Sequence, residues 1–162
     1  MKNSLLSSCL FALLLSVPCA AEKADLVVVE KAKHELTLLN SGKVIRKFHV
    51  VFGAEPVGHK QMEGDNKTPE GRYLLDFKKA DSAFYKAFHV SYPNAQDVAK
   101  ANSAGVHPGS NIMVHGQKNG FGWASAISQQ FNWTQGCIAM TNADMDAMWE
   151  LVDAGTAIDI RP

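Results

Sequence analysis

Short runs of β-branched and aromatic residues, separated by glycine, proline and asparagine, are the feature that most restricts the fold of this chain. These runs lie at 25–30, 35–39, 43–52, 71–77, 83–92, 111–115 and 157–160. Such residues favour strands, and the breakers between them favour turns. The first three runs, with a turn at Asn40-Ser41-Gly42, therefore predict an opening β-meander.

Two segments favour helices instead. Residues 95–101 predict a short one, and a second helix is expected to begin at a cap formed by Thr141 or Asn142 and to close at Gly155. The apolar positions of the second recur at helical spacing: Met145, Met148, Trp149 and Val152. Residues 54–68, rich in breakers and charges, predict a long exposed loop. The pattern indicates a single, mainly β domain with one or two packed helices.

Composition excludes several classes of function. The chain has 162 residues, of which 46% are hydrophobic and 20% charged, and this is typical of one globular domain with a real core. Sixteen basic and sixteen acidic residues give a formal net charge of zero. No nucleic-acid partner is therefore indicated by charge.

The first 21 residues predict a secretory signal peptide. Lys2 is basic, 5–17 is apolar but short for a bilayer span, and Pro18-Cys19-Ala20-Ala21 provides small residues for cleavage. An uncleaved membrane anchor is the alternative, and lipidation at Cys9 is weaker because little apolar sequence precedes it. We therefore expect an exported protein of the periplasm or cell envelope, with its domain at 22–162 and no membrane span after cleavage.

Signal cleavage would leave one cysteine, Cys137, in an oxidising compartment. A lone thiol is either buried and inert or a nucleophile. Gly136 precedes it, so the backbone can approach a substrate closely and amide groups can form an oxyanion hole. A thiol also needs a base, and His115, at the end of its own predicted strand, is the best candidate.

These residues stand in motifs that resemble the L,D-transpeptidases with the YkuD-type catalytic domain. The family signature is His-Gly on a strand followed by Ser/Thr-x-Gly-Cys, and here it reads Val114-His115-Gly116 and Thr134-Gln135-Gly136-Cys137. Thr68-Pro69-Glu70-Gly71 and Ser91-Tyr92-Pro93-Asn94 also resemble family segments. The resemblance covers roughly 26–160 and implies a YkuD-like β-sandwich.

The resemblance also implies a reaction and its residues. Cys137 would attack the amide between the L-centre of diaminopimelate and D-alanine in a peptidoglycan stem peptide, and would hold the stem as a thioester. His115 would be the base, and the amides of Gly136 and Cys137 the oxyanion donors. An amine of another stem or of a wall-linked protein, or water, would take the acyl group. The family uses no metal or organic cofactor.

One residue departs from the family pattern. Many members have arginine two residues after the cysteine, where this chain has Ala139. Loss of that guanidinium removes a group suited to binding a carboxylate. The alternatives are therefore a carboxypeptidase or amidase of the same fold, which trims stems or releases wall-linked protein, and a catalytically silent wall-binding module.

Several further residues either allow two interpretations or have no functional role assigned. Five further histidines match no zinc spacing, so no metal site is expected: His34, His49, His59, His89 and His107. Trp123, Phe131 and Trp133 either stack on glycan or form a small core of their own. Tyr92 either lines the substrate pocket or belongs to the core. Basic clusters, including Lys78 and Lys79, are interpreted as solvated faces, and the residues that bind substrate stay unknown.

Overall fold

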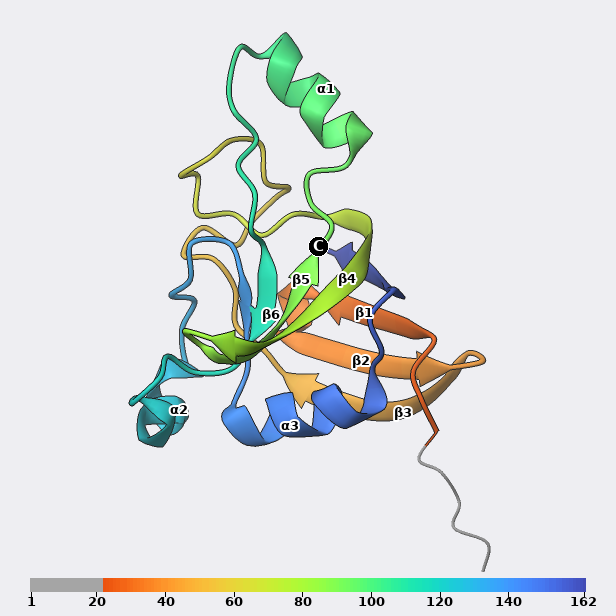
Figure 1. Cartoon of the computed structure of the whole chain (residues 1–162). Coiled ribbons are helices and arrows are strands. Elements are labelled where there is room, and N and C mark those ends of the chain that lie inside the picture. The colour runs from red at the N-terminus through yellow and green to blue at the C-terminus, as the bar shows by residue number, and fades with distance from the viewer. Residues whose placement is uncertain (1–21) are drawn as a thin grey trace, which may run out of the picture.

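The computed structural model describes residues 22–162; the predicted signal peptide lies outside this range. Within it, eight strands form one mixed sheet in the order β3-β2-β1-β8-β4-β5-β6-β7 (Figure 1). Their bounds are β1 Leu26–Glu30, β2 Glu35–Asn40, β3 Lys43–His49, β4 Gly71–Ser82, β5 Tyr85–Val90, β6 Met113–His115, β7 Ile138–Ala139 and β8 Thr156–Arg161. The helices are α1 Ala95–Ser103, α2 Ser125–Ser128 and α3 Asn142–Leu151, with 3₁₀ turns η1 Lys31–Lys33 and η2 Gly122–Ala124. The mainly β fold is confirmed.

The predicted meander forms the first part of the sheet. Strands β1, β2 and β3 pair in antiparallel order, and the turn after β2 places Gly42 at a φ of 78°. The last strand, β8, lies between β1, to which it is parallel, and β4, to which it is antiparallel. The two ends of the domain therefore meet in the middle of the sheet.

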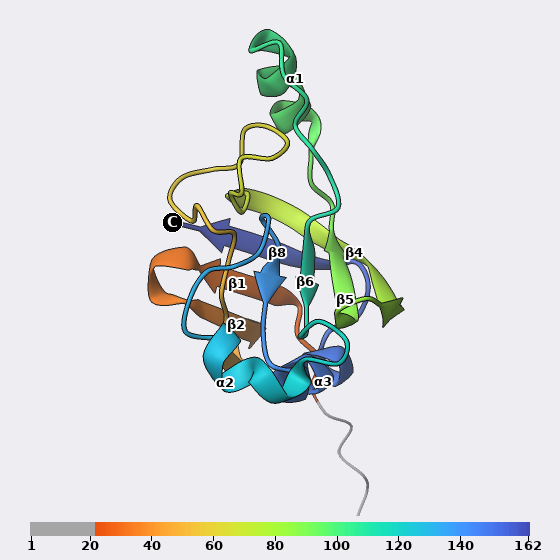
Figure 2. The same cartoon turned by 90° about the vertical axis from the view of Figure 1, so that its left-hand side faces the viewer.

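The sheet curls until its two ends are hydrogen-bonded to each other. Val51, just beyond β3, exchanges two backbone hydrogen bonds of 2.9 and 2.8 Å with Ala139 of β7. Gly53 forms a further bridge with Thr134. Figure 2 shows the curled sheet from the side of β6. This closure protects the edge strand β7 and encloses the core.

Helix α3 packs on the sheet as predicted, but it ends earlier than expected. Its cap is Thr141, whose hydroxyl accepts from the amide of Asp144 at 3.1 Å. Met145 and Met148 are fully buried, a stabilisation of about 1.5–3 kcal/mol for each such side chain. The last carbonyls of the helix accept hydrogen bonds from the ammonium of Lys78: Trp149 at 2.6 Å and Val152 at 2.9 Å.

The expectation that Gly155 closes this helix is wrong. Val152 is already extended, with φ of −121° and ψ of 132°. Gly155, with φ of 92°, lies in the turn that leads into β8. The lysine from β4 satisfies the terminal carbonyls, so no glycine cap is needed at the helix end.

The segment between β3 and β4 is not the simple exposed loop that its composition predicted. Lys60 and Thr68 are buried. The carboxylate of Asp65 accepts from the ammonium of Lys60 at 2.7 Å and from the amides of three neighbours: Gln61, Met62 and Lys67. One carboxylate thus satisfies four donors of the same loop and fixes the loop's conformation.

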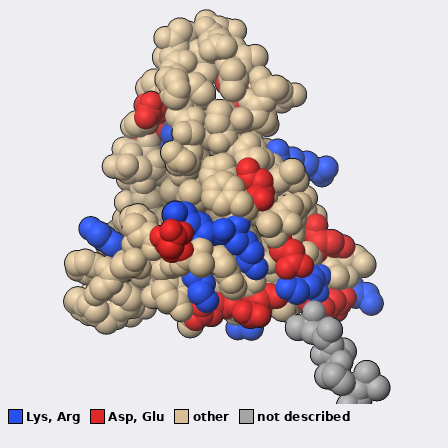
Figure 3. All heavy atoms as spheres, in the orientation of Figure 1, with Lys and Arg blue, Asp and Glu red and all other residues tan. Residues whose placement is uncertain are grey.

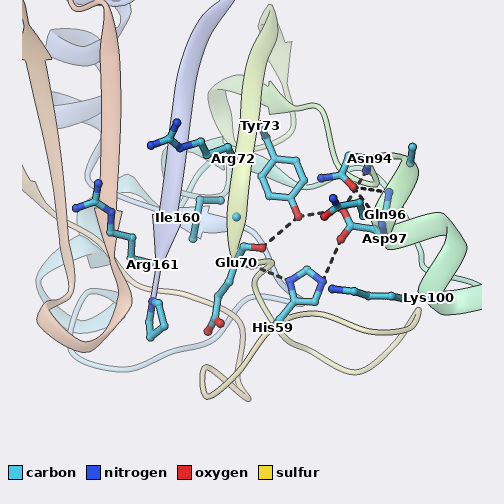
Figure 4. Close-up of a pocket in the computed structure, with 13 residues that line it drawn as sticks. His59, Glu70, Arg72, Tyr73, Asn94, Gln96, Asp97, Lys100, Ile160 and Arg161 are labelled. Atoms are coloured by element: carbon cyan, nitrogen blue, oxygen red, sulfur yellow. Dashed lines mark hydrogen bonds and ion pairs between the residues drawn. The ribbon is translucent and has the colours of Figure 1, made fainter.

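Helix α1 stands out from the body of the domain and is anchored at its first turn. Asp97 accepts from the Tyr73 hydroxyl at 3.0 Å and from the Asn94 amide at 2.9 Å. Its other oxygen lies 3.1 Å from Nε2 of His59, whose Nδ1 accepts from the Glu70 amide. Figure 4 shows these groups converging at a hollow of about 700 Å³. Their polar atoms satisfy one another, so we interpret this hollow as structural.

The buried loop also explains one glycine. A Cβ on Gly136 would lie 2.6 Å from the carbonyl oxygen of Lys67, and the residue has φ of 124°. We expect Gly136→Ala to lower the free energy of unfolding by more than about 3 kcal/mol, through strain plus overlap. The matched control is Gly155→Ala, where φ is 92° and nothing lies within 4 Å. It should lose only about 1–2 kcal/mol in urea denaturation, the cost of a left-handed backbone for a residue with a Cβ. Equal losses in both variants would contradict the close approach.

Candidate active site

The structure brings His115 and Cys137 to one hollow. Strands β6 and β7 are parallel, with Val114 opposite Ile138 and His115 opposite Ala139. Val114 and Ile138 are fully buried in the core, so the alternating residues His115 and Cys137 project from the other face. Both line a hollow of about 580 Å³. The two predicted residues, far apart in the chain, therefore meet in one site.

His115 is a buried, neutral base with a defined tautomer. Its Nδ1 lies 2.7 Å from the carbonyl oxygen of Gly116, and because a carbonyl only accepts, Nδ1 carries the proton. Nε2 is then the unprotonated nitrogen. The ring lies 4.6 Å from that of Phe84 and 5.9 Å from that of Trp133. Burial lowers the pKa of His115 to about 4, although the Gly116 carbonyl opposes this shift.

Cys137 is a thiol whose charged form is disfavoured at rest. Burial raises its pKa, while the Met113 amide and the charge of Lys60 lower it and offset part of that shift. Sγ donates to the carbonyl oxygen of Asn111 at 3.7 Å. Asn111 has a left-handed φ of 58°, a conformation that asparagine tolerates better than most residues. The pair at rest is therefore thiol and imidazole.

Thr134 shapes the turn that presents the cysteine. Its hydroxyl donates to the carbonyl oxygen of Cys137 at 2.7 Å and accepts from the Gly136 amide at 3.1 Å. The Gly136 amide is thus committed within the turn. The Cys137 amide has no acceptor among residues 22–162. Of the two amides predicted as oxyanion donors, the Cys137 amide is the one left available.

Gly116 is required by the packing behind the histidine. A Cβ there would lie 2.7 Å from the Asn142 side-chain oxygen and 3.0 Å from Cβ of Tyr85. The same Asn142 oxygen accepts from the Gln117 amide at 2.8 Å. The His-Gly pair of the sequence motif therefore lets the start of α3 approach the end of β6 closely.

A second hollow, of about 520 Å³, meets the first at Cys137. Asn111, Gln135 and Cys137 line both. The second is bordered by the loop between β3 and β4, including Lys60 and Glu63. The thiol thus lies at the junction of two openings, an arrangement suited to two peptide segments or to a peptide and water.

Several residues of the site were not predicted from the sequence. Lys79, at the end of β4, and Lys118, in the segment after β6, line the first hollow with Phe84. The sequence predicts a solvated face for Lys79, and the side chain is 42% exposed, with Nζ 3.2 Å from a carboxylate oxygen of Asp81. The pairing of the β4–β5 hairpin with β6 brings Lys79 to the cysteine, and no local motif marks either lysine.

Of the remaining sequence candidates, Trp133 lines a hollow at Cys137 and the others do not. Tyr92 is buried, donates to the Pro108 carbonyl at 3.0 Å and lines neither hollow at Cys137, so it belongs to the core. Trp133 lines the first hollow, whereas Trp123 and Phe131 are exposed.

The other histidines are dispersed in separate contacts: His34 with His49, His59 with Asp97, His89 with Asp76 and His107 with Glu63. Residues 22–162 contain no cluster of three His, Cys, Asp or Glu side chains suited to a metal.

Ala139 is fully buried, and its backbone is bonded to Val51 on one side of the strand. Its carbonyl also lies 3.5 Å from the side-chain amide of Gln129. The small side chain thus leaves the hollow without a cation at this position, and Lys79 and Lys118 are the cations at its lining.

Comparisons with known proteins agree with this fold and its motifs. The sequence model of the YkuD family, described as an L,D-transpeptidase catalytic domain, matches residues 24–160. YafK of Escherichia coli K12 is named as a putative L,D-transpeptidase. It is 31% identical over 133 residues, which are 81% of this chain and 44% of YafK.

Solved structures show the same fold. Pgp2 of Campylobacter jejuni, a helical cell shape determining protein, has a TM-score of 0.62 at 25% identity, covering 86% of this chain and 48% of Pgp2. L,D-transpeptidase 3 of Mycobacterium tuberculosis has a TM-score of 0.57 at 15% identity, covering 86% of this chain and 61% of that one, and supports the fold alone. The chain spans less than half the length of YafK and Pgp2. With the family match over nearly all described residues, this chain belongs to the YkuD family of L,D-transpeptidase catalytic domains.

Proposed function

We propose that this domain is a cysteine-dependent acyltransferase of peptidoglycan stem peptides, with Cys137 as nucleophile and His115 as base. One observation carries the proposal: the two side chains project from neighbouring parallel strands into the same hollow. The third element of the site is the Gly116 carbonyl, which holds the histidine in the tautomer a base requires.

Acylation begins with transfer of the Sγ proton to Nε2 of His115. The sulfur then attacks the carbonyl carbon of the amide between the L-centre of diaminopimelate and D-alanine. The oxyanion that forms accepts a hydrogen bond from the Cys137 amide, which is worth most where water is excluded. Protonated His115 gives its proton to the departing D-alanine nitrogen, the C–N bond breaks and a thioester remains on Cys137.

Deacylation reverses the proton path. An amine of another stem or of a wall-linked protein loses a proton to His115 and attacks the thioester carbonyl. The C–S bond breaks, and the proton returns to sulfur. The two hollows that meet at Cys137 give donor and acceptor separate approaches. Lys79 and Lys118 provide positive charge for stem carboxylates.

Water is the acceptor in a second candidate function, that of a carboxypeptidase or amidase. Ala139 favours it, because the hollow lacks the guanidinium that many relatives place there to hold an anionic peptide group. Hydrolysis needs no ordered amine, and the second hollow admits water to the thioester.

The site of action that follows is the cell wall. A substrate of this class lies outside the cytoplasm, which agrees with the signal peptide expected at residues 1–21. In the described part of the chain, no helix combines the length and apolar character required to span a bilayer.

Mass spectrometry tests the nucleophile. Incubation with a tetrapeptide-stem muropeptide should add the mass of the muropeptide minus that of D-alanine to Cys137 and release D-alanine. Cys137→Ala should give neither product. His115→Gln keeps the thiol but should slow acylation by about 10²- to 10⁴-fold, the usual contribution of a general base. Normal turnover by the alanine variant would refute the proposal.

The lowered pKa of His115 predicts acid sensitivity. The unfolded histidine, with its ordinary pKa of 6.5, binds more protons than the folded one between pH 6.5 and about 4. Stability therefore falls as the pH drops through this window, by on the order of 2 to 3 kcal/mol near pH 4.5. Urea unfolding at neutral and acid pH should show this loss reduced by that amount in His115→Gln. Equal losses in both proteins would contradict burial of a neutral imidazole.

The reaction products identify the acyl acceptor. With a free amine such as glycine added in excess, transfer predicts an amide of the stem with that amine, and hydrolysis predicts the tripeptide stem alone. The proposed acyltransferase predicts that the amide dominates, whereas the second candidate, based on Ala139, predicts that the tripeptide dominates. Purified enzyme that makes mainly the amide or crosslinked dimers would leave the transferase as the sole function.

A further inference from the structure

The segment between the catalytic histidine and cysteine, residues 117–133, exposes an apolar surface that the reaction at Cys137 does not use. Four large hydrophobic side chains of this segment are exposed: Phe121 52%, Trp123 78%, Ile127 60% and Phe131 53%. Trp123 lines neither hollow at the cysteine. Exposed aromatic groups gathered on one segment indicate an interaction surface. We name residues 117–133 the aromatic lobe.

The lobe is held rigidly, so its exposure is not a sign of loose packing. Nε2 of His49 contacts the Gln129 carbonyl at 2.9 Å, and the Phe52 amide donates to the Asn132 side chain at 2.9 Å. Inside, the side chain of Gln117 bonds both the Met140 carbonyl and the Ser128 hydroxyl. These bonds fix the backbone of the lobe, and its aromatic side chains are presented on a pre-formed surface.

The lobe is continuous with the catalytic hollow. Trp133 and Lys118 belong to the lobe and also line the hollow. The Lys118 ammonium lies over the ring of Phe121, 5.8 Å from its centre. A substrate that leaves the hollow past Lys118 therefore reaches the aromatic surface directly.

The near absence of charge on the lobe indicates which kind of polymer it can bind. Lys118 is its only charged residue. Figure 3 shows the part around α2, at the lower left, without acidic or basic groups on the visible face. Stem peptides carry carboxylates, which suit the lysines of the hollow. The sugar backbone is neutral, because the carboxyl group of each muramic acid is used in the amide bond to its stem.

We infer that the aromatic lobe is a platform for the glycan strand to which the stem peptide is attached; this rests on the proposed function. The rings of Trp123 and Phe121 pack on apolar faces of N-acetylated sugars. The Gln130 side chain, whose Nε2 donates to the Ala126 carbonyl at 2.9 Å, offers its Oε1 to their polar groups. The scissile bond is three residues from the sugar, about 10 Å along an extended stem, so the sugar falls outside the hollow rather than at its floor.

A membrane surface is the less suitable partner. Binding to anionic lipids uses clusters of lysine and arginine, and this lobe has one cation. Interfacial helices present a long apolar face, whereas α2 has four residues.

Binding to chitin, a neutral polymer of N-acetylated sugars without stems or carboxylates, tests the platform. Trp123→Ala should weaken sedimentation with chitin about fivefold to tenfold, the loss expected for one aromatic contact. Trp123→Phe, which keeps a ring, should retain most of the binding. Val44→Ala, exposed on β3 outside the lobe, is the matched control and should bind like the wild type.

Kinetics separate this inference from the proposed function. Turnover of a free tetrapeptide without sugar should be unchanged in Trp123→Ala, while KM for the glycan-linked substrate should rise with kcat preserved. Unaltered glycan binding in Trp123→Ala would overturn the platform while leaving the catalytic proposal intact. Binding to anionic vesicles in place of glycan, or a dimer that dissociates in this variant, would overturn it equally. A wild type inactive on both substrates would refute the proposed function instead.

Discussion

The backbone bonds between Val51 and Ala139 close the sheet, and the site depends on them. Strand β7 has only two residues, too few to hold a position alone. It is fixed because β6 pairs with one of its edges and the segment after β3 pairs with the other. This double pairing sets the register that puts Cys137 on the same face as His115. Any slip by one residue would turn the thiol into the core.

Closure also determines the electrostatics of the site. The loop after Val51 packs behind Gly136, and Phe84 and Trp133 cover the ring of His115. Burial then lowers the pKa of the imidazole and raises that of the thiol, so both groups are neutral at rest. A neutral pair suits a reaction in which the charge forms only when substrate arrives, and it protects a lone thiol from oxidation, because the thiolate is the reactive form.

The aromatic lobe connects the two proposed catalytic residues along the chain. Gln117 and Asn132 tie it to the residue after β7 and to the segment after β3, next to the bonds that close the sheet. Its inner side forms a wall of the hollow through Trp133, and its outer side presents Trp123 to solvent. The proposed substrate would use both surfaces, because its reacting peptide and the sugar chain that carries it are different chemical groups.

The strand pattern, the cap at Thr141 or Asn142 and the His-Gly and Thr-x-Gly-Cys motifs are local features. They were therefore sufficient to predict the mainly β class, the approximate start of α3 and the two catalytic candidates. The local rule that a glycine ends a helix failed at Gly155. The Lys78 ammonium, from a distant strand, donates to the last carbonyls of α3 instead. Local rules also failed at Lys60, which is buried although its charge predicted solvent. Which cations line the hollows, which amide is free at the cysteine and how the two motifs meet depend on the folded molecule. Sheet closure and burial arise from contacts between residues far apart in the chain, and no local propensity encodes those contacts.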